Sequence, residues 1–263
     1  MHKITLPLII WIILGYGCSA SVNNNTSMHT PIYQQDTQHL LQPYMSKTIQ
    51  HLNLETIHYV DYHRGTGNYI FRGNTPLSND GFPYEELMRE IKHIANNKLH
   101  RIIGDNPYLI DISLINNIAE ESHLKIEELF FKNNPDKGEL VNHPIYGALT
   151  SPNCYPKNIR KEMEKIPNID NMSQLLSTIK EKIDHKKDRP QIIYIHCQSG
   201  FDRTGEVIAA YQMRYSQCSY ESAYTNANKI AGRPINNYCH AGLQWYAYYL
   251  QDIENLTSIG AIH

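Results

Sequence analysis

The chain has 263 residues, with 24 basic and 26 acidic side chains and a formal net charge of −2 at pH 7. This length allows one domain of generous size, or one domain with tails. The near-balanced charge gives no reason to expect bulk nucleic-acid binding or a polybasic membrane patch, and a hydrophobic content of 41% is enough for a folded core.

Residues 1–20 have the pattern of a secretory signal peptide. Lys3 precedes an apolar stretch at residues 6–14, and small residues follow as far as Ala20. About nine apolar residues are too few to cross a bilayer core of about 30 Å as a helix. We therefore predict cleavage after Ala20, an exported protein (periplasmic or secreted), and no membrane span in the mature chain. Cys18 supports a lipoprotein alternative, but Leu14 lies one position too far upstream for the usual Leu-x-x-Cys pattern.

The next segment, residues 21–40, is rich in Asn, Ser, Thr and Gln and has no apolar period, which predicts a flexible leader. Residues 41–263 are expected to form a single domain. Within it the apolar spacing predicts a short strand at 69–71, a helix across 82–97, a buried strand at 99–103, a helix around 114–119 and a strand at 124–131.

Residues 133–171 are rich in Pro and Asn and predict a long loop with one short helix near 159–165. A helix follows at 172–183, then a buried strand that begins near residue 191, a helix after residue 205, and two closing helices around 220–230 and 241–253. Strands that alternate with helices predict an α/β fold, with a central, mostly parallel sheet flanked by helices.

The segment QIIYIHCQSGFDRTG, residues 191–205, is the most informative part of the chain. Its apolar strand ends at Cys197, a short loop closes at Arg203, and a helical pattern follows at once. The small residues Ser199 and Gly200 allow a tight loop whose N–H groups point inward. Together with a helix N-terminus and the Arg203 guanidinium, such a loop can hold a phosphate dianion over the sulfur. The same field stabilises a thiolate, so we expect Cys197 to ionise well below the usual pKa of about 8.5.

This segment resembles the signature HCxxGxxR[ST] of the cysteine-dependent protein-tyrosine and dual-specificity phosphatases. The resemblance implies a protein-tyrosine-phosphatase-like domain over residues 41–263 that needs no cofactor and no metal. It implies that Cys197 attacks phosphorus to form a phosphocysteine, that Arg203 binds the equatorial oxygens, and that His196 orients the loop from behind. It also implies a set of residues that contact the substrate, namely Gln198, Ser199, Gly200, Phe201 and Thr204.

The general acid is not fixed by the sequence. Asp202 is our choice for a catalytic role, because loops that read HCxxGxDRTG in bacterial phosphatases, and the similar loops of myotubularin-type lipid phosphatases, carry an Asp there. Asp170 lies at the end of the long loop but could equally cap the helix that follows. Asp136 lies early in that loop, far from the signature in sequence.

The substrate class also stays open. Gln198 and Phe201 occupy positions where phosphoinositide phosphatases often carry Lys, which favours a singly phosphorylated residue such as phosphotyrosine. The Phe201-Asp202 pair, however, is similar to the myotubularin loop. We therefore expect a phosphorylated protein or a phosphoinositide as partner, and no nucleic acid. The main prediction is a protein-tyrosine or dual-specificity phosphatase, and the alternatives are a phosphoinositide or inositol-phosphate phosphatase and an inactive phosphate-binding module.

Five cysteines are present, and four would remain after removal of Cys18. Four cysteines spread over a chain of this length do not form a disulfide scaffold, and whether those other than Cys197 pair is left open. The Cys239-His240 pair is too isolated for a structural zinc site, which needs about four ligands.

Overall fold

The computed structural model describes residues 50–166 and 170–263. The expected signal peptide at 1–20, the leader at 21–40 and the start of the domain at residue 41 lie outside these residues and stay predictions. In the described part of the chain, no helix combines the length and the apolar character that a bilayer crossing requires.

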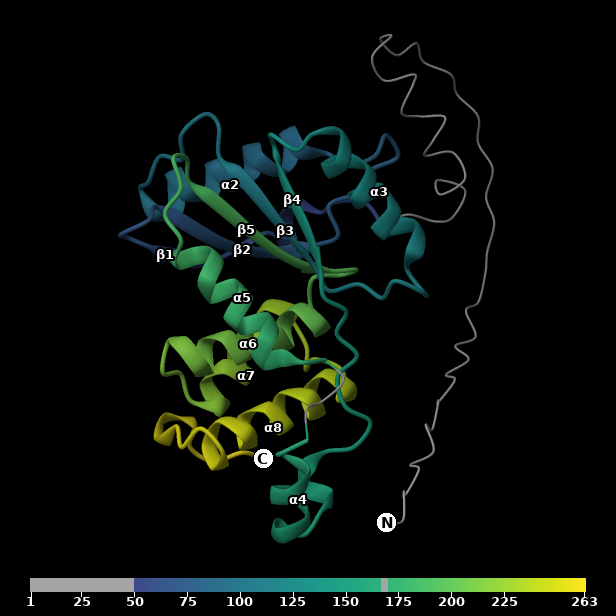
Figure 1. Cartoon of the computed structure of the whole chain (residues 1–263), viewed down its shortest axis with the longest axis vertical. Coiled ribbons are helices and arrows are strands. Elements are labelled where there is room, and N and C mark those ends of the chain that lie inside the picture. Colours follow the sequence, from purple (N-terminus) through teal and green to yellow (C-terminus); the bar gives the residue numbers. More distant parts are fainter. Residues whose placement is uncertain (1–49, 167–169) are drawn as a thin grey trace, which may run out of the picture.

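A five-stranded sheet in the order β1-β2-β5-β3-β4 forms the centre of the fold (Figure 1). The strands are β1 (His58–His63), β2 (Asn68–Asn74), β3 (Tyr108–Ser113), β4 (Gly138–Asn142) and β5 (Gln191–Cys197). Only the β1–β2 pair is antiparallel. Strand β5 lies in the middle and is buried along its whole length, as its apolar side chains on both faces require. The predicted mostly parallel sheet is confirmed.

Helices cover both faces of the sheet (Figure 1). On one face α2 (Tyr84–Leu99) and α3 (Glu121–Asn133) cover β5 side chains such as Ile192 and Tyr194. On the other face Ile193 and Ile195 pack into a core with α5 (Met172–Asp184), α6 (Asp202–Tyr215), α7 (Tyr220–Ala231) and α8 (Asn237–Asp252). The remaining helices are short: α4 (Lys157–Met163), η1 (Leu54–Thr56), η2 (Pro152–Cys154) and η3 (Thr257–Ile259).

The helices predicted at 82–97, 172–183 and 220–230 are confirmed, and the last predicted helix begins earlier, at Asn237. Three predictions between residues 99 and 131 are wrong. The strand lies at 108–113 rather than 99–103, residues 114–119 form a loop and turn, and residues 124–131 belong to a helix. In both misassigned elements a buried acid, Asp111 or Glu127, stands where the pattern needs an apolar residue. In the strand and in the helix, a buried carboxylate therefore interrupted the apolar periodicity from which the element is predicted.

The long loop predicted at 133–171 contains two elements, β4 and α4. Strand β4 is short and only partly buried, so it carries little apolar signal. The short helix predicted near 159–165 corresponds to α4, which begins slightly earlier.

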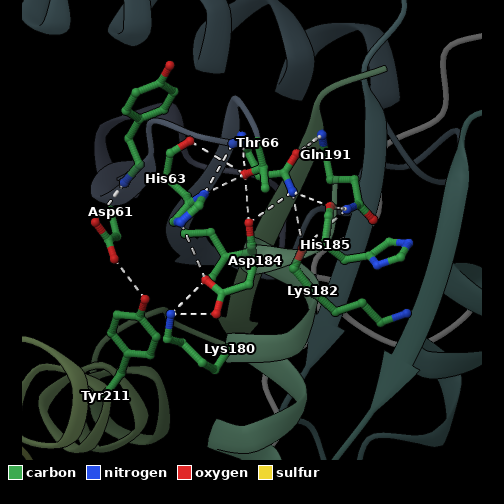
Figure 2. Close-up of polar contacts among 12 residues, drawn as sticks. Asp61, His63, Thr66, Lys180, Lys182, Asp184, His185, Gln191 and Tyr211 are labelled. Atoms are coloured by element: carbon green, nitrogen blue, oxygen red, sulfur yellow. Dashed lines mark hydrogen bonds and ion pairs between the residues drawn. The ribbon is translucent and has the colours of Figure 1, made fainter. Parts of the chain in front are cut away.

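A polar network joins the turn between β1 and β2 to the end of α5 (Figure 2). The Thr66 hydroxyl donates to the carbonyl of Ile183 at 2.8 Å, and the Gln191 side-chain amide donates to the carbonyl of His185 at 2.8 Å. Behind them the buried Asn68 accepts the Gln191 N–H at 2.9 Å and donates to the carbonyls of Ile183 and His185. These bonds fix α5 against the start of β5, at the opposite end of that strand from Cys197.

We predict that Asn68→Ala lowers the free energy of unfolding by about 2 to 4 kcal/mol, because it leaves several buried backbone groups unpaired. Urea denaturation followed by circular dichroism measures this. The matched control is Asn97→Ala on the exposed face of α2, which should change stability by only about 0.5 kcal/mol. Equal effects of the two substitutions would contradict the structural role given to Asn68.

Candidate active site

The signature segment forms a strand, a loop and a helix. Strand β5 ends at Cys197, which pairs with Asn74 of β2, and α6 begins at Asp202. The loop folds back over the end of β2, where Gly200 has a φ of +78° and an added Cβ would lie 2.5 Å from the backbone of Gly73. Only glycine fits this position without displacing the main chain, so the loop is held tightly at the C-terminal end of the parallel strands.

Cys197 lies at the base of this loop with an exposed fraction of 1%. Burial alone would raise the pKa of its thiol. The positive charge of Arg203, the hydroxyl and N–H of Thr204 and the N–H of Gly200 outweigh burial, so the pKa of Cys197 lies below its ordinary value. This is the direction that the signature loop predicts, and it favours a thiolate. The cysteines of the described residues (Cys154, Cys197, Cys218 and Cys239) are all free thiols.

Arg203 is held by Glu120, the residue just before α3. The two Nη atoms donate to the two carboxylate oxygens at 2.6 and 2.8 Å, and Glu120 also accepts the N–H of Asn116 at 2.8 Å. Although burial opposes it, the ion pair lowers the pKa of Glu120 and raises that of Arg203. Glu120 therefore orients the guanidinium beside the loop. It was not identified from the sequence, because the two residues are 83 positions apart.

Asp202 is paired with a second arginine. Both carboxylate oxygens accept from Arg233 at 2.8 Å, and one of them also accepts the N–H of Asn236 at 2.8 Å. These bonds, above all the one from Arg233, lower the pKa of Asp202 below its ordinary value. Arg233 lies between α7 and α8 with 49% of its side chain exposed, so the pair adds a partly exposed guanidinium next to the signature loop. No local pattern marked Arg233 in the sequence.

Asp170 binds a loop and does not cap a helix. Its exposed fraction is 2%, and its carboxylate accepts the N–H groups of Tyr146 and Gly147 at 2.9 and 2.8 Å. The helix cap is Asn171, which makes no capping bond with its side chain, so the interpretation of Asp170 as a helix cap is wrong. Burial raises the pKa of Asp170. Its bonds fix the loop that follows β4, and that loop is bound to the start of α8 through Ala148 and Tyr238.

Asp136 lies at the other end of the sheet. It directly precedes Lys137, whose carbonyl accepts the N–H of Leu109 at the start of β3. Leu109 in turn pairs with Ile192 at the start of β5, whereas Cys197 stands at the end of that strand. The structure therefore separates Asp136 from the signature loop.

Three exposed apolar side chains belong to segments that are connected to the site. Ile118 lies between Leu114 and Glu120, both of which accept bonds from Arg203, and its exposed fraction is 84%. Tyr146 follows β4 and Tyr238 begins α8, with exposed fractions of 44% and 55%. Their exposure leaves these side chains free of the apolar core.

Residues 141–247 match the family model of the dual specificity phosphatase catalytic domain. The matched span runs from the end of β4 through the signature loop and into α8. This is the catalytic domain of a class of phosphoric monoester hydrolases. Over these residues the chain matches the catalytic domain of the dual-specificity phosphatases, which belong to the superfamily of cysteine-dependent phosphatases.

Solved structures that match the chain include a kinase associated phosphatase in which serine replaces the catalytic cysteine. It is 14% identical, the match covers 80% of this chain and 97% of that one, and the TM-score is 0.43. PTPMT1 in complex with PI(5)P is 14% identical over 76% and 97% of the two chains, with a TM-score of 0.40. The core catalytic domain of the PP-IP phosphatase SIW14 from S. cerevisiae is 15% identical over 81% and 99%, with a TM-score of 0.36. No curated protein matches the chain.

Proposed function

We propose that this protein is a protein-tyrosine or dual-specificity phosphatase that works through a phosphocysteine intermediate. The observation that carries the proposal is Cys197, a buried thiol whose pKa is lowered by Arg203 and by the N–H groups of its own loop. A stabilised thiolate at the junction of a strand and a helix is the nucleophile that phosphoryl transfer needs.

In this proposal the Cys197 sulfur attacks phosphorus in line with the leaving oxygen. Arg203, oriented by Glu120, binds the equatorial oxygens and balances their charge in the transition state. The N–H groups of residues 198–201 complete the binding of the phosphate. Water then hydrolyses the phosphocysteine, and the Thr204 hydroxyl donates to the departing thiolate. No step requires a metal.

We propose Asp202 as the group that moves the proton of the leaving oxygen. It is the remaining sequence candidate at the signature loop, since Asp136 lies at the far end of the sheet and Asp170 is engaged by two backbone N–H groups. The pair with Arg233 opposes protonation of Asp202, so its acid form is scarce at neutral pH and grows as the pH falls.

The substrate that we propose is phosphotyrosine or another singly phosphorylated side chain in a protein. Arg203 is the sole cation inside the signature loop, and the apolar side chains of Ile118, Tyr146 and Tyr238 suit an aryl group above it. Besides the Phe201-Asp202 pair, Arg233 favours the alternative, because a phosphoinositide carries further phosphates that a second guanidinium could bind. We also retain the proposal of export after Ala20, which rests on the sequence pattern alone.

We expect the chain from residue 21 to hydrolyse p-nitrophenyl phosphate without added metal and to be inhibited by vanadate. Cys197→Ser should lower kcat by about 10⁴-fold or more while phosphate binding persists, because the nucleophile is lost but the N–H groups and Arg203 remain. Cys154→Ser, at an exposed free thiol, is the control and should keep full activity. Activity that survives Cys197→Ser refutes the mechanism, and vanadate binding without turnover in the unmodified chain identifies an inactive phosphate-binding module.

Asp202→Asn should slow the hydrolysis of alkyl phosphates by about 10² to 10⁴-fold and that of p-nitrophenyl phosphate much less, because a good leaving group needs little protonation. The measurement is kcat for a series of esters with different leaving groups. Asp188→Asn, at an exposed acid in the turn before β5, serves as the control. A uniform loss over the whole series would exclude Asp202 as the proton donor.

A phosphotyrosine peptide should have a kcat/KM about tenfold or more above that of phosphoinositides in vesicles, since the apolar side chains around the site favour an aryl ester. The comparison is repeated with Arg233→Gln, which removes the second guanidinium. If phosphoinositides are the better substrates and lose that advantage in Arg233→Gln, the lipid phosphatase alternative replaces our proposal.

A further inference from the structure

A cluster of charged side chains is buried on the face of β5 opposite the thiol of Cys197. Asp111 of β3, Glu127 of α3 and His196 of β5 each have an exposed fraction of 0%. The Nε2 atom of His196 lies 3.1 Å from an Asp111 carboxylate oxygen and 3.6 Å from a Glu127 oxygen. Side chains from three elements thus meet at the residue that precedes the nucleophile.

We infer that Asp111 and Glu127 are positioning residues for Cys197, which act by holding a cationic His196 imidazole directly behind the nucleophilic loop. The inference rests on the proposed function, since it assigns these residues to the thiolate chemistry of the same site. It names two residues outside the signature that would tune this chemistry.

The charges in the cluster explain how it is stable. Two carboxylates and one imidazole cannot all be buried without compensation, because each unpaired charge loses its hydration. The His196–Asp111 contact at 3.1 Å is an ion pair by distance, and its geometry is not that of a hydrogen bond. Although burial opposes it, Asp111 and then Glu127 raise the pKa of His196 to about 9, so the imidazole is cationic at neutral pH.

Glu127 is the second carboxylate and keeps its proton at neutral pH. Burial raises the pKa of Glu127 to about 8, and Asp111 adds to this effect while His196 opposes it. The Thr75 hydroxyl donates to Glu127 at 3.3 Å. With Glu127 neutral and His196 cationic at neutral pH, the imidazolium lies 3.1 Å from Asp111, which is its nearest acidic partner in the cluster.

Two contacts connect the cluster to the signature loop. His196 is bonded through the chain to Cys197, and its own carbonyl accepts the N–H of Leu114 at 2.9 Å. Thr75, which binds Glu127, donates its backbone N–H to the carbonyl of Gln198 at 3.2 Å. His196 is the residue next to Cys197 in the chain, whereas Asp111 lies on the neighbouring strand. The positive field of the imidazolium therefore favours the thiolate form of Cys197.

The neighbouring residue Tyr194 does not supply the positive charge that the cluster places behind Cys197. Tyr194 of β5 stacks on the His196 ring at 5.7 Å, and burial raises its pKa well above the ordinary value, so it stays neutral. Cys197 also raises the pKa of His196. Arg72 of β2 donates a hydrogen bond to the Gly200 carbonyl at 2.7 Å. It also interacts electrostatically with Cys197 and Tyr194.

The experiment measures the rate at which iodoacetate alkylates Cys197 as a function of pH, with mass spectrometry of the labelled peptide. Asp111→Asn keeps the shape of the side chain but removes the charge that stabilises the imidazolium. We expect the alkylation midpoint of Cys197 to rise by about one pH unit, which makes alkylation at pH 6 about tenfold slower. In a His196→Asn background, Asp111→Asn should add nothing, because the residue acts through His196.

An unchanged midpoint in a folded Asp111→Asn variant would overturn the inference. A full effect of Asp111→Asn in the His196→Asn background would overturn it as well, because Asp111 would then act without the imidazole. Because alkylation reports on the thiolate and needs no phosphatase substrate, a failure of the proposed function would leave this result intact.

Glu127→Gln tests the second carboxylate without risk to the ion pair. The pKa of Glu127 is raised on folding, so its contribution to stability is complete below the unfolded pKa of about 4.5 and is lost as the pH rises through about 8. Gln does not titrate, and the unfolding temperature of Glu127→Gln relative to the unmodified chain should therefore increase steadily from pH 4.5 to pH 8. Its alkylation midpoint below pH 8 should stay unchanged.

The matched control is Glu128→Gln at the next position of α3, where the side chain is 44% exposed and no such pH dependence is expected. A difference in unfolding temperature that does not vary with pH would overturn the neutral state assigned to Glu127.

The last experiment is the addition of Zn²⁺ or Mn²⁺. If either ion stabilises the unmodified chain but not Glu127→Gln, the cluster binds a metal and our inference is wrong.

Discussion

The bidentate ion pair between Arg203 and Glu120 is the interaction on which the site depends. A buried sulfur anion is unstable unless charge and N–H groups surround it, and Arg203 supplies the largest opposing charge at Cys197. A guanidinium on a flexible stem provides that charge reliably only if its orientation is fixed. Glu120 fixes it with two bonds, and a backbone N–H from Asn116 fixes Glu120 in turn. The short loop that leads into α3 is therefore as much part of the site as the signature itself.

Helix α3 connects two parts of this arrangement. Glu120 immediately precedes the helix and binds Arg203 on one side of the nucleophilic loop, while Glu127 lies about two turns further on and contacts His196 behind it. Because Glu120 is the N-cap residue of α3 and Glu127 lies within the helix, the position of α3 sets the placement of two of the cations near Cys197. This gives a physical reason for an acid at a fully buried position of a helix.

The signature loop was predictable from the sequence because strand, loop and helix are contiguous, and their chemistry needs no distant partner. The helices around it were predictable for the same reason, since their apolar spacing is regular. The prediction failed between residues 99 and 131, where Asp111 and Glu127 interrupt the apolar pattern of a strand and a helix. Glu120 and Arg233 could not be identified either, since each acquires its role from a partner 83 or 31 positions away.

The buried charges of Asp111, Glu127 and His196 are better explained by function than by stability. A cluster such as Asp111, Glu127 and His196 could in general be replaced by apolar side chains of similar volume without loss of stability, and often with a gain. Its presence is therefore poorly explained as a device that holds the fold together. The two faces of β5 differ accordingly: Ile193 and Ile195 pack into an apolar core below the thiol, whereas His196 places charge on the opposite face at the last position before it. Charge is buried where the strand approaches the nucleophile, and this placement connects the cluster to the chemistry of the site.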